Sequence, residues 1–145
     1  MGRLLFWQGI VAEDPSVILV DTSVIVAWLD KSHDFHRECS EAMWNWIQRE
    51  PLGVSSVTFA ELAAGTRTRE HIDEALRIFD RLELSFDAAW RAGHAFRQYR
   101  RKENDKPVLP DFLIRAQAAV LNLPHLTNDR RRIKSFPDVE FEFIT

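Results

Sequence analysis

The chain has 145 residues, of which 46% are hydrophobic and 28% are charged, and its formal net charge is −3 at pH 7. This composition fits one folded domain with a substantial core and excludes an intrinsically disordered chain. A nucleic-acid ligand would need a local basic patch, because the chain as a whole is slightly acidic. The one cysteine, Cys39, excludes an internal disulfide and fits a reducing compartment, so we expect a cytoplasmic protein.

The first sixteen residues differ from the rest, because no regular pattern begins before Val17. Their apolar stretch is short and is interrupted by Gln8 and Gly9. It also lacks a small-residue cleavage site, so we do not expect a signal peptide. No other run is apolar over the length that spans a bilayer. We expect an N-terminal extension over 1–16, a single domain over 17–145 and no membrane contact.

Short apolar runs predict the strands of a central sheet, and apolar residues at helical spacing predict helices between them. The predicted strands cover 17–20, 53–57, 82–86, 124–127 and 139–144, the last with the alternation of an edge strand. A helix running to Leu29 is predicted after Asp21, with Thr22 or Ser23 as its N-cap, although Val24, Ile25 and Val26 locally favour a strand. The other predicted helices cover the stripe Cys39, Met43, Trp46 and Ile47, the stripe Ile72, Leu76 and Phe79, the stretch 87–101 with Asp87 as N-cap, and 110–122. Strands separated by helices predict an α/β fold. We expect a three-layer α/β/α sandwich with a mostly parallel central sheet of four or five strands.

An acidic residue, Asp21, directly follows the apolar run VILV and precedes another apolar stretch. A buried carboxylate is costly unless a backbone cap, a salt bridge or a metal ion compensates it. In a parallel sheet, ligands bind beyond the carboxyl ends of the strands. Three further acids are expected near that edge, namely Glu61, Asp111 and Asp129.

Each of these three acids also has a purely structural interpretation. Thr58 and Glu61 have the spacing of a capping box at a helix start. Asp111 lies in a predicted first helical turn, where Arg115 four residues on could pair with it. Asp129 could cap a last short helix.

Taken together, the acids indicate a metal site. Clustered carboxylates repel one another and stay ionised together only when cations neutralise them. A site made of oxygen ligands prefers Mg²⁺ or Mn²⁺ to zinc. Two such ions about 3.5–4 Å apart can activate a water and stabilise the leaving oxygen of a phosphodiester. We therefore predict a nuclease site.

Three segments resemble the motif blocks of PIN-domain ribonucleases, and most closely those of the VapC-type toxins of bacterial toxin–antitoxin pairs. They are VILVDTSVIVAWL, SSVTFAELAAGT and LPDFLIRAQAAVLNLPHLTNDRRRIKSFPDVEF, and the resemblance extends from about Val17 to Phe143. It implies that Asp21, Glu61, Asp111 and Asp129 are the catalytic acids that bind Mg²⁺ or Mn²⁺, with Ser23 and Thr127 as supporting hydroxyls. Residues 1–16 have no counterpart in the family, and the segment after Asp129 carries more arginine than the usual pattern.

The resemblance also implies an activity and partners. The activity would be that of an endoribonuclease, in which metal-activated water hydrolyses an RNA phosphodiester without using the ribose 2′-OH as nucleophile. The partners would be an antitoxin protein and a second copy of the chain in a homodimer. An exposed apolar groove near Trp28 and Trp44 is one hypothesis for the antitoxin site, and core packing is the other.

Basic residues directly follow the last acid. Arg130, Arg131 and Arg132 are predicted to contact RNA because they lie beside the expected site, although a solvated face is the plainer alternative.

Other functions fit less well. A phosphatase with its nucleophile at the end of the first strand would need a second Asp two residues on, where Ser23 stands. A nucleotide-binding fold would need a glycine-rich phosphate loop, which the sequence lacks. The alternative that stays open is a catalytically silent PIN-fold module that binds RNA or protein.

Overall fold

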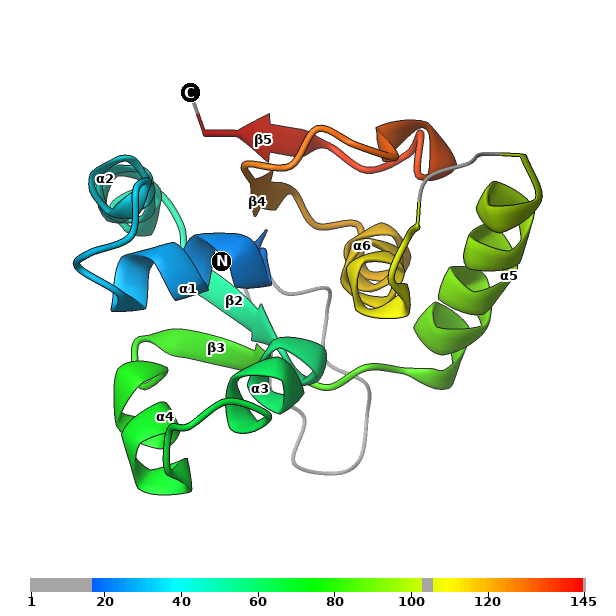
Figure 1. The fold of residues 1–145 in the computed structure, drawn as a ribbon. Helices are drawn as coiled ribbons and strands as arrows, with labels where there is room; N and C mark the ends of the chain where they lie inside the picture. Colours follow the sequence, from blue (N-terminus) through cyan, green and yellow to red (C-terminus); the bar gives the residue numbers. More distant parts are fainter. Residues whose placement is uncertain (1–16, 103–105, 145) are drawn as a thin grey trace, which may run out of the picture.

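A computed structural model describes residues 17–102 and 106–144 (Figure 1). The expected N-terminal extension, 1–16, lies outside these residues. The described strands form one five-stranded sheet in the order β3–β2–β1–β4–β5, and each neighbouring pair is parallel. The strands are β1 (Ile18–Val20), β2 (Leu52–Ser55), β3 (Phe79–Leu82), β4 (His125–Thr127) and β5 (Phe141–Phe143).

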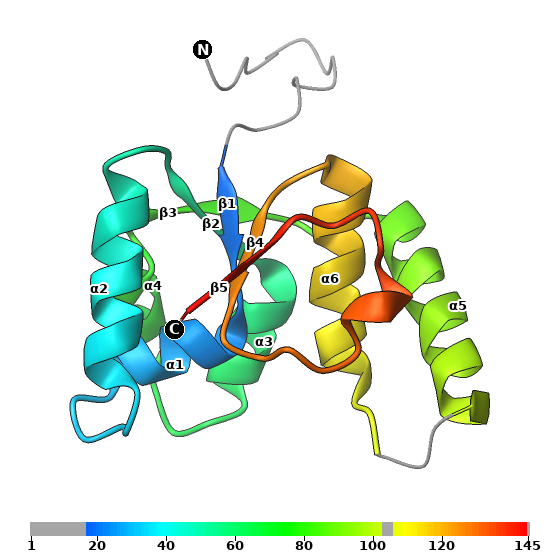
Figure 2. The same cartoon turned by 90° about the horizontal axis from the view of Figure 1, so that it is seen from above.

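Helices cover both faces of this sheet (Figures 1 and 2). They are α1 (Thr22–Leu29), α2 (His36–Ile47), α3 (Ser56–Ala63), α4 (Arg69–Ala75), α5 (Phe86–Lys102) and α6 (Leu109–Leu121), with a short 3₁₀ helix, η1 (Ile133–Ser135). This arrangement confirms the predicted α/β/α sandwich. None of the described helices is both long and apolar enough to cross a membrane.

The two faces of β1 show how the core is divided. Ile18 and Val20 pack in one cluster with residues of α1, α2 and α4. Val17 and Leu19 pack in a second cluster with residues of α5 and α6. Because successive side chains of a strand point to opposite faces, one fully apolar strand supplies both cores.

The third strand lies three residues earlier than predicted. Phe79, which the helical stripe included, pairs with Leu52 in the sheet, and α4 ends at Ala75. The apolar spacing of Ile72, Leu76 and Phe79 was therefore misleading, because all three side chains reach the same core from two different elements. The predicted N-cap of α5 was also wrong, since Ser85 rather than Asp87 accepts a hydrogen bond from the amide of Ala88, at 3.1 Å.

The topology brings the candidate acids to one edge. Asp21 directly follows β1, and Asp129 lies two residues beyond β4. Helix α6 runs back across the sheet before β4, so its first turn, with Asp111, lies at the same edge (Figure 2). Parallel strands linked by helical crossovers produce this convergence.

Candidate functional site

Asp21 is a buried carboxylate whose hydrogen bonds come from three donors. Its Oδ1 accepts from the backbone amide of Thr22 at 3.0 Å, so Asp21 is the N-cap of α1 in place of the predicted Thr22 or Ser23. Its Oδ2 accepts from the hydroxyls of Thr127 at 2.7 Å and Ser23 at 3.1 Å. The carboxylate in the apolar run is therefore compensated by a cap and two hydroxyls, which fix its orientation.

Glu61 lies on α3 and faces α1. Its Oε1 accepts a 2.7 Å hydrogen bond from the hydroxyl of Thr22, which also bonds the hydroxyl of Thr58 at 2.7 Å. The capping-box interpretation of Thr58 and Glu61 is wrong, because α3 begins earlier. Its N-cap is Ser55, whose hydroxyl accepts from the amide of Val57 at 3.0 Å.

Asp111 pairs with Arg132 rather than with Arg115. The Arg132 guanidinium lies 3.3 Å from Asp111 Oδ2, and only 4% of the Arg132 side chain is exposed. Arg115, four residues after Asp111 on α6, is also buried. Its guanidinium donates to the backbone carbonyls of Asp129, at 3.0 Å, and of Arg131. The expected helical ion pair is therefore replaced by two contacts with the segment after β4.

Asp129 is held by its neighbour Arg131. The Arg131 guanidinium donates to both carboxylate oxygens at 3.0 Å, and its backbone amide donates to Oδ1 at 2.9 Å. The alternative that Asp129 caps a last helix is wrong, because η1 begins at Ile133 and Arg132 stands at its N-cap. The Asp129 side chain instead accepts its hydrogen bonds from Arg131, two residues further along the chain.

The charges of these acids influence one another. Burial raises the pKa of Glu61, and the negative charges of Asp111 and Asp21 raise it further against the hydrogen bond from Thr22. Burial and the charges of Asp21 and Asp129 likewise raise the pKa of Asp111. Burial alone would raise the pKa of Asp129, but its bonds with Arg131 hold this pKa below its usual value. Asp111 thus lies within electrostatic reach of each of the other three acids, and Glu61 within reach of Asp21.

The donor set suits a hard divalent cation, since every candidate ligand is a carboxylate. Burial, together with repulsion from the other acids, raises the pKa values of Glu61 and Asp111, and such an ion would offset both effects. In the described part of the chain, however, no three Asp, Glu, His or Cys side chains are already placed to hold an ion together. Arg131 and Arg132 supply positive charge to Asp129 and Asp111 in this arrangement.

Four polar neighbours of the site make contacts that were not predicted from the sequence. Thr22 bonds Glu61, Asn128 accepts from Ser23 at 2.9 Å, and Arg115 holds the segment after β4. His125 is fully buried, its Nδ1 lies 3.0 Å from the carbonyl of Leu19, and its Nε2 lies 4.0 Å from Asp21 Oδ1. Burial lowers the pKa of His125. The one available signal was Arg115, a charge inside the apolar run FLIRAQAA.

The three arginines predicted to contact RNA, Arg130, Arg131 and Arg132, have different neighbours in the structure. Arg130 lies over the ring of Phe143, with its guanidinium carbon 4.1 Å from the ring centroid. Arg131 bonds Asp129, and Arg132 is buried against Asp111. Two of the three arginines therefore contact the acids themselves.

Comparison with known proteins identifies the class to which this fold and site correspond. The PIN domain family matches residues 18–141, so the chain belongs to the PIN domain family. It is 34% identical over 113 residues to Ribonuclease VapC10 of Mycobacterium tuberculosis, a match that covers 74% of this chain and 78% of that protein. This relative bears out the resemblance to VapC-type proteins.

Solved structures show the same fold. VapBC2 from Rickettsia felis, bound to a DNA fragment from its promoter, aligns with a TM-score of 0.69 and 19% identity over 89% of this chain and 99% of that chain. A toxin–antitoxin complex from Klebsiella pneumoniae aligns with a TM-score of 0.65 and 24% identity over 84% of this chain and 94% of that chain.

Proposed function

We propose that this protein is a Mg²⁺- or Mn²⁺-dependent endoribonuclease and the toxin of a toxin–antitoxin pair. The observation that carries the proposal is the buried carboxylate of Asp21, oriented by Thr127 and Ser23 at the edge where Glu61 and Asp111 repel it electrostatically. The named activity of the VapC10 relative supports the same reaction. RNA as substrate and a single buried cysteine fit the cytoplasm.

In this proposal Asp21, Glu61, Asp111 and Asp129 would hold the metal. A bound divalent ion supplies a water of lowered pKa and positive charge for the phosphodiester oxygens. The chain's own polar groups keep the acids in place. Thr127 and Ser23 orient Asp21, Thr22 orients Glu61, and Arg115 fixes the backbone that carries Asp129. Arg131 and Arg132 would leave their acids when the ion binds.

The proposal is tested by incubating the purified protein with single-stranded RNA in Mg²⁺ and, separately, in EDTA. We expect cleavage in Mg²⁺ alone. A matched RNA carrying 2′-O-methyl groups should still be cleaved wherever it binds, because the ribose hydroxyl is not the nucleophile. Cleavage that persists in EDTA, or products that end in a 2′,3′-cyclic phosphate, would contradict the proposed reaction.

The antitoxin partner is a second part of the proposal. Phe35 and Trp44, at the start and on the surface of α2, are 52% and 67% exposed. A cavity of about 410 Å³ lies between Phe35 and the segment of Asp129 and Arg131. A partner helix that inserts apolar side chains there would also cover Asp129. Trp28 does not contribute in the way expected, since it packs edge-on against Phe79 in the core cluster.

The antitoxin proposal is tested by co-expressing the chain with the product of any small reading frame that adjoins its gene. The partner should co-purify and suppress RNA cleavage, and Trp44→Ala should weaken the complex while leaving cleavage by the free protein unchanged.

A homodimer is also expected, and the exposed Phe86 and Trp90 of α5 are a candidate surface for it. Sedimentation of the purified chain measures it directly.

A catalytically silent module is the second candidate function. The three arginine contacts that already neutralise Asp129 and Asp111 favour it, because they stabilise the acids without metal. Absence of RNA cleavage under all metal conditions, together with retained RNA binding, would establish this alternative.

A further inference from the structure

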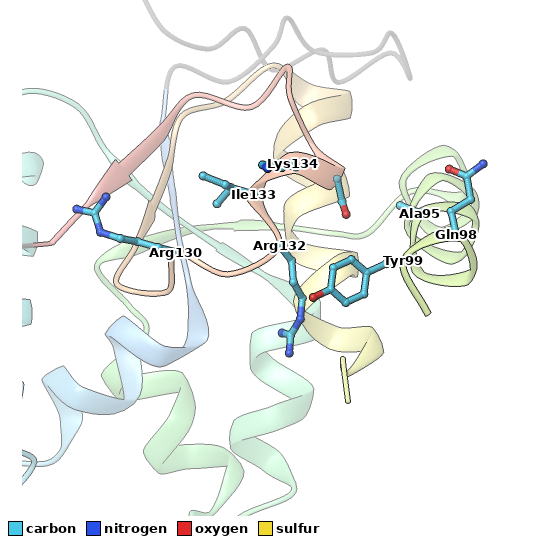
Figure 3. Close-up of a pocket in the computed structure, with 8 residues that line it drawn as sticks. Ala95, Gln98, Tyr99, Arg130, Arg132, Ile133 and Lys134 are labelled. Atoms are coloured by element: carbon cyan, nitrogen blue, oxygen red, sulfur yellow. The ribbon is translucent and has the colours of Figure 1, made fainter. Parts of the chain in front are cut away.

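A second cavity lies beside the acidic site, between α5 and the segment 130–135. It has a volume of about 670 Å³, and its lining includes Tyr99 of α5 and Lys134 of η1 (Figure 3). Arg132 also lines this cavity, while its guanidinium lies 3.3 Å from Asp111. One side chain therefore forms a wall of the cavity and contacts the candidate metal site.

The lining of this cavity is suited to an anion. Among the residues that the structure describes, its lining contains Arg130, Arg132 and Lys134 and no acidic side chain. The three cations differ in availability. Arg132 already pairs with Asp111, and Figure 3 shows the Arg130 side chain directed away from Tyr99, consistent with its position over Phe143. Lys134 is exposed and belongs to the lining, so it is the cation best placed to bind a phosphate.

The cavity also contains an aromatic side chain in a fixed position. Tyr99 extends from α5 toward Arg132 (Figure 3), and the Arg132 guanidinium carbon lies 5.8 Å from its ring centroid. Its ring packs against Phe112 of the core at 5.7 Å between centroids. Unpaired RNA bases stack on such side chains, and this stacking tolerates many sequences.

We propose that this cavity binds one nucleotide of single-stranded RNA next to the scissile phosphate, with its phosphate on Lys134 and its base against Tyr99. The inference rests on the proposed function, which puts the scissile phosphate at the acids that Arg132 adjoins. The cavity volume lies within the usual range of small-ligand sites and is large enough for a nucleotide. Duplex RNA is not expected to bind in this cavity, because its bases stack on one another and cannot stack on Tyr99.

The first test measures binding of a fluorescent single-stranded RNA by anisotropy in EDTA, where the proposed hydrolysis does not proceed. We expect Lys134→Ala to raise the Kd and to reduce the slope of log Kd against log salt by about 0.7, the value for one phosphate contact on a single strand. Lys31→Ala is the matched control, since this exposed lysine follows α1 on the other side of the sheet from α5 (Figure 2). Equal Kd values and slopes for the two variants would overturn the inference.

The second test locates the base. The same RNA, with 4-thiouridine at successive positions, is irradiated on the wild-type protein, and the crosslinked peptides are identified by mass spectrometry. We expect a crosslink to the peptide that contains Tyr99, and its loss in competition with unlabelled single-stranded but not duplex RNA. Crosslinks confined to other peptides would overturn the inference.

The two tests separate this inference from the proposed function. Crosslinking at Tyr99 together with no cleavage in Mg²⁺ would support the nucleotide site and reject the ribonuclease. Cleavage in Mg²⁺ with no effect of Lys134→Ala would do the reverse.

Discussion

Asp129 takes three hydrogen bonds from one neighbour, because the guanidinium and the backbone amide of Arg131 all reach its carboxylate. The parallel N–H groups of a guanidinium match the two oxygens of a carboxylate well. The same carboxylate is a proposed metal ligand, so the guanidinium and the ion compete for it. Arg131 is therefore expected to limit metal affinity in addition to any contact with RNA.

Replacing this arginine tests the competition. We expect Arg131→Ala to tighten Mn²⁺ binding by about two- to fivefold, a modest factor because the Arg131 side chain is 68% exposed and such ion pairs contribute little. Isothermal titration of Mn²⁺ without RNA measures the change, with Arg130→Ala as control. Weaker Mn²⁺ binding in Arg131→Ala would show that this arginine supports the metal site.

At the scale of elements, α6 fixes the segment that follows β4. Arg115 is 3% exposed, and its guanidinium donates to the carbonyls of Asp129 and Arg131. These bonds join α6 to the segment that follows β4 and contains Asp129. Burial lowers the pKa of Arg115 against the opposing charges of Asp21 and Asp129, so the surrounding acids help to keep it charged.

The loss of these bonds has a predictable cost. Arg115→Met keeps the apolar length of the side chain but leaves two carbonyls without their donor, and we expect a loss of about 2–4 kcal/mol in the free energy of unfolding. RNA cleavage should fall as well, because Asp129 loses its support. Urea denaturation measures the first effect. Arg77→Ala, which removes an exposed pair with Glu74, is the control and should change little.

Element by element, the sequence was informative where one rule dominated. The run VILV predicted β1, and the acid at its end marked the candidate site, but the N-cap of α1 is Asp21 itself and not Thr22 or Ser23. β3 was displaced because its apolar residues continue the spacing of α4. The partners of Arg131, Arg132 and Arg115 were not predictable, since they depend on how the chain turns after β4, where Arg132 adopts a left-handed φ of 63°.

At the scale of the whole molecule, the parallel sheet concentrates negative charge at one edge. The fold raises the pKa values of Glu61 and Asp111, so these groups bind protons more readily in the folded than in the unfolded state. The stability that these two groups contribute to the metal-free protein is therefore lost as the pH rises through the usual carboxylate range to the raised pKa values. Asp129 acts in the opposite direction, because its pKa is lowered and its ionised form stabilises the fold.

The opposite pKa shifts of Glu61 and Asp129 predict opposite effects of their replacement on the melting temperature of the metal-free protein. Glu61→Gln should raise the melting temperature at pH 7 by about 1–3 °C, because it removes repulsion and keeps an oxygen that accepts from Thr22. Asp129→Asn should lower it. Both differences should shrink in acid, below the usual pKa of a carboxyl group. Scanning calorimetry in EDTA measures them, and a destabilised Glu61→Gln would show that repulsion among the acids is negligible.

The account depends on the claim that carboxylates distant in the chain act as one centre for divalent cations. The most direct measurement compares RNA cleavage in Mg²⁺ by the wild type, by Asp21→Asn and by the control Asp87→Asn, with the fold of each checked by circular dichroism. Asparagine also caps helices well, so the variant should stay folded. We expect Asp21→Asn to lose activity by about a hundredfold or more and Asp87→Asn to retain it. Undiminished cleavage by folded Asp21→Asn would contradict the account.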